Sequence, residues 1–486
     1  MAAIYGQAKM LIGGQAVASA GNSVIQTVNP ATGEAVAEVP SATVEDVNTA
    51  VIAAQKAQPT LAAMTVWERA ALLGEIADRL EQRKEELAVV VSLESGKPLH
   101  PEAVGEIGAA VQGFRNAAEL VKWLDGSVVA TEDPHKRVFS FYVPRGVYAV
   151  VTPFNFPVNI PVEYIAPAIA TGNSVVWLPA LGTSYSAIKL AEIMQSAGLP
   201  TGVINVVTGD GSVIGDALVG HPGVNGIGFT GSTETGSRIA QQGSGKAQLM
   251  EFGGNGPTIV LEDADLDCAV DAVFTSCFVN AGQTCTSAER ILIHVDLQEA
   301  FAHRLRDKVQ KTVQLGDPTD PQTTMGPLHK ESIADKMDAH VADALQKGAT
   351  LLCGGRRAAG FATDLFYEPT ILTGCAQDSR VNLEETFGPI APFVPFTTHE
   401  EALAIAAQGN FGLLASVFTT SAKHAFHFTE RLRSGIVTIN EHSNYWELHI
   451  PFGGAAGTKS GLGRIGGKHT LLAMSDVKTM IWDISR

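Results

Sequence analysis

The chain has 486 residues, of which 45% are hydrophobic and 17% charged, a composition that excludes a disordered or fibrous protein and suits two or three domains. Its 34 basic and 50 acidic residues give a net charge of −16, and their scatter argues against a nucleic acid or a membrane surface as partner. With no apolar run of about 18 residues and no signal-peptide core, we expect a cytoplasmic protein. The five cysteines lack CxxC or close Cys/His spacing, so neither a disulfide framework nor a metal site is expected.

Three amphipathic helices are predicted in the N-terminal third, after a short β-like start. The stretch from Thr43 to Asp46 resembles a capping box, and the stretch from Thr65 to Glu68 is a clearer one. Residues 95–98 (SGKP) are expected to stop the helical pattern that follows, and a third helix is expected over residues 102–124. The apolar stripes of these helices are interpreted as core-facing surfaces.

Strands and helices alternate from residue 138 onward. The predicted elements are strands 138–143 and 147–152, helix 157–170, strand 174–178, helix 184–196, strand 203–207, helix 212–219 and strand 226–229. Repeated βαβ units imply a parallel, doubly wound sheet that binds ligands beyond the carboxyl ends of its strands, which favours a nucleotide. A second α/β pattern contains strands 258–261, 291–295 and 437–440 and helices 266–280, 297–314, 330–346, 400–409 and 422–432.

Two glycine-containing turns are candidates for a phosphate contact. The stretch from Gly209 to Gly215 is one residue too long for GxGxxG and is interpreted as a turn that enters a helix. Residues 229–236 (FTGSTETG) are better placed, because a strand there ends in a small-residue turn that opens a helix. Free N–H groups and the Ser232 hydroxyl would suit a phosphate at the helix N-terminus; alternatively, Ser232 is an ordinary N-cap.

Cys285 lies between two threonines, after a glycine turn and an apolar helical run. A thiol among small polar residues suits a nucleophile that an incoming carbonyl must reach, and only its thiolate attacks. The alternative is a buried structural cysteine, because free cysteines are among the most buried residues. Residues elsewhere in the chain decide between the two.

Five segments resemble the NAD(P)-dependent aldehyde dehydrogenase superfamily, and the match spans nearly the whole chain. They are residues 152–157 (TPFNFP), 229–236 (FTGSTETG), 250–257 (MEFGGNGP), 282–285 (GQTC) and 384–389 (EETFGP), and residues 451–454 (PFGG) and 460–464 (SGLGR) add the family's C-terminal signature.

The resemblance implies an α/β fold with three parts. These are a Rossmann-like dinucleotide-binding domain (residues 1–122 and 145–253), an α/β catalytic domain (254–453) and a small β oligomerisation element with the C-terminal tail (123–144 and 454–486). Strand-like residues 138–143 and 477–484 are expected to pair across the subunits of a homodimer or homotetramer.

The resemblance also assigns chemical roles. Cys285 matches the nucleophile, and Asn155 matches the oxyanion donor that works with the backbone N–H of Cys285; one such donor is typically worth about 3 kcal/mol of barrier. Glu251 matches the general base that takes a proton from the thiol or from the hydrolytic water. Because coenzyme-A-acylating relatives generally lack this glutamate, hydrolysis to a free acid is favoured. Tyr164 and Ile465 stand at common lysine and glutamate positions, so the proton relay to bulk solvent differs from the family pattern.

The expected cofactor is NAD, with NADP as the alternative. The family's cofactor contacts fall on Thr152, Phe154, Gly231, Ser232, Glu385 and Phe387. Leu178 and Leu181 replace a lysine and a glutamate that bind the adenosine ribose in the family. Losing the glutamate removes a charge that disfavours a 2′-phosphate, while losing the lysine removes a donor that would bind one. NADP would then use the hydroxyl of Thr183 or Ser184.

An aromatic aldehyde is the hypothesised substrate. By the same resemblance, the substrate tunnel is lined by Phe156, Ile160, Glu163, Thr284, Thr286, Trp446 and Phe452. Three aromatic side chains favour a flat or apolar aldehyde, and residues 440–449 loosely resemble the benzaldehyde and vanillin dehydrogenase branch. Glu163 would instead select a cationic aminoaldehyde, and an aliphatic semialdehyde is a further alternative.

The leading interpretation is therefore an oxidoreductase that forms a thiohemiacetal and then a thioester on Cys285 and hydrolyses the thioester. A coenzyme-A-acylating dehydrogenase or a thioesterase-like hydrolase is another reaction open to the same scaffold. A different class of function is also open, namely a binding protein that has kept this fold but no longer catalyses a reaction. The changes at Leu178 and Leu181 favour this alternative.

Overall fold

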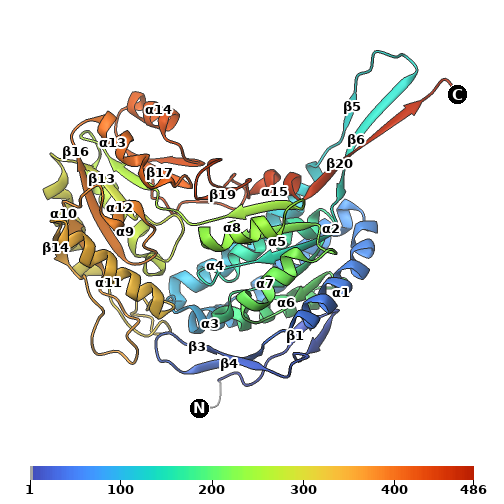
Figure 1. Cartoon of the computed structure of the whole chain (residues 1–486), viewed down its shortest axis with the longest axis horizontal. Coiled ribbons are helices and arrows are strands. Elements are labelled where there is room, and N and C mark those ends of the chain that lie inside the picture. The colour runs from blue at the N-terminus through green and yellow to red at the C-terminus, as the bar shows by residue number, and fades with distance from the viewer. Residues whose placement is uncertain (1–3) are drawn as a thin grey trace.

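Two mostly parallel β-sheets with flanking helices form the two halves of the molecule in the computed structural model, which describes residues 4–486 (Figure 1). A small three-stranded sheet projects from the first half, and the C-terminus lies at its far end. The predicted α/β class, with two α/β units and a small β element, is confirmed.

The first sheet has its topological switch point between β7 and β10. Its strand order is β19-β11-β10-β7-β8-β9-β1-β2, and β7 to β11 run parallel. Successive strands are added outward from β7 to β9 on one side and from β10 to β11 on the other. Ligands bind at a topological switch point of this kind, beyond the carboxyl ends of the strands. The strands are β1 Met10–Ile12, β2 Gln15–Val17, β7 Val147–Val151, β8 Ser174–Leu178, β9 Ile204–Val206, β10 Gly226–Thr230, β11 Ala247–Glu251 and β19 Gly461–Leu462.

Alternate residues of this sheet pack into separate cores on its two faces. Tyr148 and Val150 of β7 belong to one buried cluster, and Val147 and Ala149 belong to another, as the two-residue period of a strand requires. The helices of this half are α1 Val44–Ala63, α2 Val66–Gln82, α3 Lys84–Ser95, α4 Val104–Leu120, α5 Asn159–Ala170, α6 Ser184–Ser196, α7 Gly211–Gly220, α8 Thr233–Gln242 and α15 Gly467–Ala473. Both predicted capping boxes are confirmed at the starts of α1 and α2.

The second sheet has the order β14-β15-β16-β13-β12-β17-β18, and all its neighbours except β14 and β15 pair parallel. Its strands are β12 Pro257–Val260, β13 Arg290–His294, β14 Thr350–Cys353, β15 Thr370–Thr373, β16 Ile390–Phe396, β17 Leu414–Phe418 and β18 Ile436–Ile439. Its helices are α9 Leu266–Phe278, α10 Gln298–Thr312, α11 Glu331–Gln346, α12 Arg380–Leu383, α13 His399–Ala406 and α14 Ala422–Arg431. The predicted second α/β pattern is confirmed.

The small sheet joins the two strand-like segments that the sequence singled out. Strand β6 (Lys136–Pro144) pairs antiparallel with β20 (Ser475–Asp483) and with β5 (Ser127–Val129), all within one chain. The segments therefore pair with each other in the monomer, and pairing with a second subunit stays a prediction. Part of the predicted C-terminal tail (residues 454–486) belongs to the first sheet, because β19 pairs with β11 at its edge.

Two strands of the N-terminal region, β3 (Val24–Val28) and β4 (Ala35–Pro40), form a separate antiparallel hairpin. Within residues 4–486, none of the helices combines the length and the apolar character that a bilayer crossing requires.

Arg290 fastens the start of β13 to the end of α13. Its wholly buried guanidinium donates to the carbonyls of Asn255 (2.7 Å), Ile405 (3.2 Å) and Ala406 (3.1 Å). The last carbonyls of a helix lack intrahelical partners, and a cation there also interacts favourably with the helix dipole. Burial lowers the pKa of Arg290 to about 10, so the side chain keeps its charge at neutral pH.

Replacing Arg290 by leucine is expected to lower the free energy of unfolding by about 3 kcal/mol or more, because several buried carbonyls lose their donor. Denaturant unfolding followed by circular dichroism measures the change. Arg304→Leu, which removes an exposed partner of Asp267, is the control and should cost less than about 1 kcal/mol. Equal losses in the two variants would contradict the role of Arg290.

Candidate active site

A left-handed turn places Cys285 at the active site. Helix α9 ends at Phe278, not at residue 280 as predicted, because Asn280 and Ala281 both have a φ of 53° and Gly282 a φ of 71°. A Cβ on Gly282 would lie 2.1 Å from the carbonyl oxygen of Gly388, so only glycine fits there. Consecutive non-glycine residues at positive φ are costly and persist only where other contacts hold them.

Glu102 supplies one of those contacts. Its carboxylate accepts from the backbone N–H of Asn280 at 3.0 and 3.1 Å. Burial raises the pKa of Glu102 to about 7, and this hydrogen bond acts in the opposite direction. The carboxylate therefore holds the first residue of the left-handed turn that leads to the thiol.

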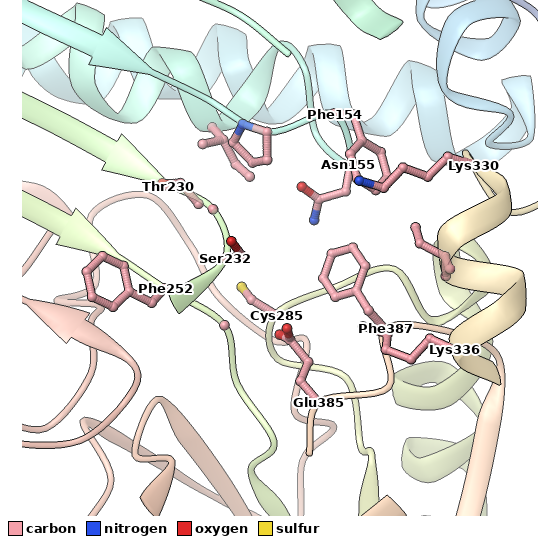
Figure 2. A pocket seen from close by; sticks show the side chains of 15 residues that line it. Phe154, Asn155, Thr230, Ser232, Phe252, Cys285, Lys330, Lys336, Glu385 and Phe387 are labelled. Carbon is pink, nitrogen blue, oxygen red and sulfur yellow. The ribbon is translucent and has the colours of Figure 1, made fainter. Parts of the chain in front are cut away.

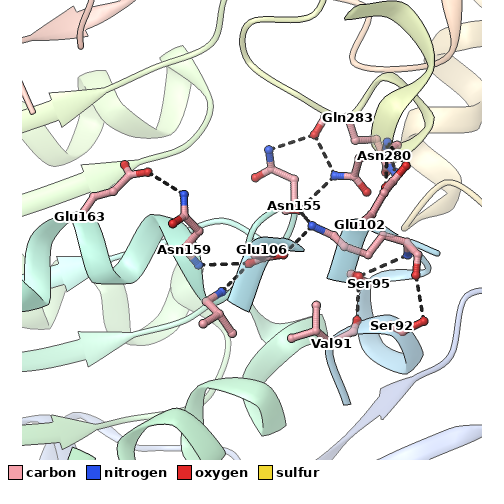
Figure 3. A network of polar contacts seen from close by, with 12 residues as sticks. Val91, Ser92, Ser95, Glu102, Glu106, Asn155, Asn159, Glu163, Asn280 and Gln283 are labelled. Atoms are coloured by element: carbon pink, nitrogen blue, oxygen red, sulfur yellow. Dashed lines mark hydrogen bonds and ion pairs between the residues drawn. The ribbon is translucent and has the colours of Figure 1, made fainter. Parts of the chain in front are cut away.

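The Asn155 loop is tied to the cysteine loop by several hydrogen bonds (Figure 3). The Asn155 amide donates to the carbonyl of Gln283 at 2.9 Å, and the Asn280 amide donates to the carbonyl of Asn155 at 3.0 Å. The Asn155 carbonyl also accepts from the Lys97 ammonium at 2.7 Å. The predicted nucleophile and the predicted oxyanion donor are thus held in one network, although they are far apart in sequence.

Lys97 forms a buried ion pair with Glu106 at 2.6 Å, with side-chain exposures of 1% and 0%. Glu106 also accepts from the backbone N–H groups of Val158 (2.8 Å) and Asn159 (3.1 Å), which begin α5. The ammonium lies 3.9 Å from the ring centre of Phe156. The sequence does not predict this pair, because residues 95–98 are expected only to stop a helix. The one available signal for a role of Lys97 is its position between a glycine and a proline.

Cys285 lies where two cavities meet, because both cavities are lined by Cys285, Ile160 and Thr230. The first has a volume of about 270 Å³ and the second of about 200 Å³. Figure 2 shows Cys285 and Asn155 on the walls of the first cavity. Its wall contains five of the six predicted cofactor residues, namely Phe154, Gly231, Ser232, Glu385 and Phe387.

Thr152 is the exception, since its hydroxyl accepts from the Trp177 indole at 2.8 Å beneath the site. The first cavity also contains Lys330 and Lys336 of the α11 region, which the sequence prediction missed. In the sequence, a lysine that lines a cavity looks the same as an ordinary surface lysine on an amphipathic helix. The sequence therefore gives no signal for Lys330 or Lys336.

The second cavity brings together all seven residues predicted for the substrate tunnel. Its wall contains Phe156, Ile160, Glu163, Thr284, Thr286, Trp446 and Phe452, together with Glu251, Asn159, Asn444 and Ile465. Trp446 and Phe452 have ring centres 4.8 Å apart, and the Trp446 indole donates to the carbonyl of Ile450 at 2.9 Å. The apolar rings therefore have fixed orientations at the cavity wall.

Glu251 is buried, and neither of its carboxylate oxygens has a hydrogen-bond partner among residues 4–486. Burial raises its pKa well above the ordinary value, with Glu163 adding to the effect and Arg464 opposing it. Burial and the nearby Glu385 and Glu251 likewise raise the pKa of Cys285. The thiol is therefore protonated at rest and needs a base to form the thiolate.

The residues on the first cavity's wall fit a dinucleotide. Glu385 accepts from the backbone N–H of Gly254 at 2.9 Å, and a Cβ on Gly253 would lie 2.6 Å from the Glu385 carboxylate. Phe387 has a φ of 62°, and Glu289 holds that strained residue by accepting from its backbone N–H. Ser232 caps α8 by accepting from the N–H of Thr235 at 3.3 Å, so its predicted N-cap role is confirmed. It also lines the cavity, and its contact with a phosphate stays a prediction.

The two hydroxyls that are predicted to contact NADP are both buried. Thr183 and Ser184 are fully buried, and the Ser184 hydroxyl donates to the carbonyl of Ala180 at 3.1 Å. The Ser184 hydroxyl is therefore already engaged, whereas the Thr183 hydroxyl has no hydrogen-bond partner among residues 4–486. Near Glu251, the Tyr164 hydroxyl donates to the carbonyl of Phe229 at 2.9 Å, and the apolar Ile465 lines the second cavity.

Comparison with known proteins agrees with this site. The model of the aldehyde dehydrogenase family matches residues 16–480. The chain is 38% identical over 472 residues to the NADP-dependent succinate-semialdehyde dehydrogenase GabD of Escherichia coli (strain K12), covering 97% of this chain and 96% of that protein. It is 37% identical over 470 residues to the mitochondrial succinate-semialdehyde dehydrogenase of Arabidopsis thaliana, covering 96% and 88%.

A solved structure supports the same assignment. The crystal structure of an NAD-dependent aldehyde dehydrogenase from Sinorhizobium meliloti is similar with a TM-score of 0.95 at 37% identity, covering 99% of this chain and 95% of that chain. The chain therefore belongs to the aldehyde dehydrogenase family. It is an NAD(P)-dependent oxidoreductase that acts on an aldehyde.

Replacing Glu106 by glutamine is expected to leave the buried Lys97 charge without its counter-ion and to lower the free energy of unfolding by about 3–5 kcal/mol. Glu119→Gln is the matched control on the same helix, because Glu119 pairs with Lys122 at 2.8 Å but is 70% exposed. This control should change the free energy by less than about 1 kcal/mol. Denaturant unfolding measures both; a Glu106 variant as stable as the control would refute the role of the pair.

Proposed function

We propose that this aldehyde dehydrogenase oxidises an uncharged, apolar aldehyde, with an aromatic aldehyde preferred, and releases the free acid. The observation that carries the proposal is the position of Cys285 where two cavities meet. The first has glycine, aromatic and charged residues on its wall. The second combines five aromatic or aliphatic residues with threonines, asparagines and two glutamates; the five are Phe156, Ile160, Trp446, Phe452 and Ile465. A small apolar aldehyde in the second cavity reaches the thiol from one side, and the cofactor reaches it from the other.

In the proposed reaction, the Cys285 thiol attacks the aldehyde carbon and its proton passes to Glu251, which gives a thiohemiacetal. The side-chain amide of Asn155 and the backbone N–H of Cys285 stabilise the oxyanion. When bound, NAD(P)⁺ supplies the hydride acceptor. Once Glu251 has passed the thiol's proton to solvent, it takes a proton from the water that hydrolyses the Cys285 thioester, and the acid and the free thiol are released.

Hydrolysis, rather than transfer of the acyl group to coenzyme A, is supported by the state of Glu251. Its two oxygens have no hydrogen-bond partner in the described chain, so they are free to accept a proton from water or thiol. A structural glutamate at the end of a strand would instead be expected to be satisfied by neighbours or solvent. The burial that raises the pKa of Glu251 also makes it a stronger base than an ordinary glutamate.

The charge on the second cavity's wall supports an uncharged substrate. Glu163 and Glu251 both line this cavity, and none of its described lining residues is lysine or arginine. Burial raises the pKa of Glu163 well above its ordinary value, and the nearby Glu106 adds to the effect. Burial thus disfavours a negative charge on Glu163 and weakens its attraction for a cationic aminoaldehyde. Phe156, Trp446 and Phe452 offer apolar contact instead.

Succinate semialdehyde is the second candidate, because the relatives from E. coli and A. thaliana carry that activity in their names. Its carboxylate would have to enter a cavity that holds two carboxyl groups and offers no cation among the residues named above. Burying an uncompensated charge is strongly unfavourable. The cavity therefore favours the apolar aldehyde over this candidate.

NAD is the proposed preferred cofactor, since Leu178 leaves no lysine to bind a 2′-phosphate and the Ser184 hydroxyl already donates to the carbonyl of Ala180. A homodimer or homotetramer is proposed because β20 exposes large apolar side chains, which suit an interface better than water. Among them, Val477 is 63%, Ile481 69% and Trp482 58% exposed.

Glu251→Gln is expected to lower kcat by about 10²–10⁴-fold, the usual contribution of a general base. Because the base must be deprotonated and its pKa is raised, the kcat of the parent enzyme should rise with pH through a value well above the ordinary glutamate range. The variant should lose that rising limb. Steady-state rates across pH measure both effects, and Glu119→Gln is the control. A variant that keeps kcat within about threefold would remove Glu251 from the mechanism.

Benzaldehydes are expected to have a kcat/KM at least about 100-fold above that of succinate semialdehyde, the cost of about 2.7 kcal/mol for placing a carboxylate in this cavity. Production of reduced cofactor without coenzyme A is measured with benzaldehyde, hexanal, succinate semialdehyde and 4-aminobutanal, each with NAD⁺ and with NADP⁺. If succinate semialdehyde or 4-aminobutanal is the best substrate, the proposed specificity is wrong. Clearly tighter binding of NADP⁺ than of NAD⁺ would likewise refute the cofactor preference.

A further inference from the structure

Three metal-binding side chains from separate segments meet at the carboxyl edge of the second sheet. Glu262 follows β12, His399 is the first residue of α13 after β16, and His424 lies in the first turn of α14 after β17. One ligand atom from each lies within 4.8 Å of the others. The three residues are far apart in sequence, so they lack the short Cys/His spacing that predicts a metal site. For this reason no metal site is expected from the sequence.

The contacts within this cluster are close and specific. His399 Nε2 lies 3.2 Å from each carboxylate oxygen of Glu262. The rings of His399 and His424 have centres 4.6 Å apart and are nearly perpendicular, at 81°. Helices α13 and α14, which carry the two histidines, lie together in the upper part of Figure 1.

His424 carries an unsatisfied nitrogen. Its Nδ1 is buried and has no hydrogen-bond partner in the described part of the chain, and it lies 3.9 Å from a carboxylate oxygen of Asp263. A buried polar atom without a partner is uncommon and calls for an explanation, such as an ion. The backbone at this position is fixed, since the N–H of His424 donates to the Ser421 hydroxyl at 3.3 Å.

Asp263 holds the loops that carry the cluster. It accepts from the Thr419 hydroxyl at 2.8 Å and from the N–H of Thr420 at 3.1 Å, which joins the loop after β12 to the loop after β17. The N-termini of α13 and α14 carry partial positive charge, which opposes a cation. Glu262 and Asp263 offset that charge with two carboxylates.

The ligand set indicates the class of metal. Two imidazoles and one carboxylate suit Zn²⁺ and similar transition metals, with a water completing the coordination. Bonds of about 2.0–2.2 Å require the ligand atoms to move closer together than they are here. Side-chain exposures of 41% for Glu262, 20% for His399 and 29% for His424 leave room for that adjustment and for an ion to enter.

We propose that Glu262, His399 and His424 form a binding site for Zn²⁺ or a similar transition-metal ion, separate from the active site. None of the three lines either cavity at Cys285. Strands β12 and β13 run parallel, and Cys285 precedes β13, so the thiol lies toward the amino edge of the sheet and the metal site at its carboxyl edge. The ion joins the loops after β12, β16 and β17 and stabilises this half of the protein without entering the reaction.

The test uses the full-length chain with Cys285→Ala, so that the active-site thiol does not bind the metal. After removal of metals with EDTA, calorimetric titration with ZnCl₂ is expected to show one site per chain, and Zn²⁺ is expected to raise Tm. His399→Ala and His424→Ala should each weaken Zn²⁺ binding at least about tenfold. Binding should also weaken between pH 7 and pH 5.5, because an imidazole must be deprotonated to bind a metal.

His303→Ala is the control, since His303 is an exposed histidine that lies 3.9 Å from Glu299 on α10. It should leave Zn²⁺ binding unchanged. Circular dichroism and Tm without metal establish that each variant folds, and Glu262→Gln, which keeps the side-chain shape, serves if an alanine variant does not. No Zn²⁺ binding by the parent, or binding that the ligand variants leave unchanged, would overturn the proposal.

Discussion

The buried ion pair of Lys97 and Glu106 is the contact on which the active-site geometry depends. The Lys97 ammonium holds the carbonyl of Asn155, and Glu106 holds the first N–H groups of α5. Glu102, just before the same helix α4, holds Asn280 in the turn before Cys285. One end of α4 therefore positions both Asn155, the proposed oxyanion donor, and the turn that leads to Cys285, the proposed nucleophile. A buried ion pair adds little net stability, since desolvation offsets its attraction, so its value here is positional.

The same burial that fixes the site controls its protons. Glu163, Glu251 and Cys285 all have raised pKa values because burial disfavours their charged forms. The thiol is neutral at rest, and in the proposed reaction its proton moves to the Glu251 carboxylate, whose pKa is raised in the same direction. Such matching lowers the cost of transfer relative to a buried thiol beside an ordinary carboxylate. Where the family pattern has a lysine, Tyr164 instead donates its hydroxyl to a backbone carbonyl.

The sequence predicted those parts of the structure that depend on local pattern. Strand β8 and helix α6 have the predicted bounds, since apolar periodicity and turn residues define them. The tunnel residues were predicted by resemblance and line one cavity. Lys97, Lys336 and Glu289 were not predicted, because their roles arise from contacts across distant segments. The end of α9 was also misplaced, since a carboxylate remote in sequence, Glu102, sets the turn after it.

The two sheets use opposite edges for the active site. The first sheet contributes residues beyond the carboxyl ends of β7 and β10, whereas the second contributes Cys285, just before the amino end of β13. The carboxyl edge of the second sheet, where an open α/β sheet usually binds its ligand, is thereby left outside the reaction. It carries Glu262, His399 and His424 instead. A ligand at that edge would act on catalysis only through the strands between, so an ion bound there would change stability without entering the reaction.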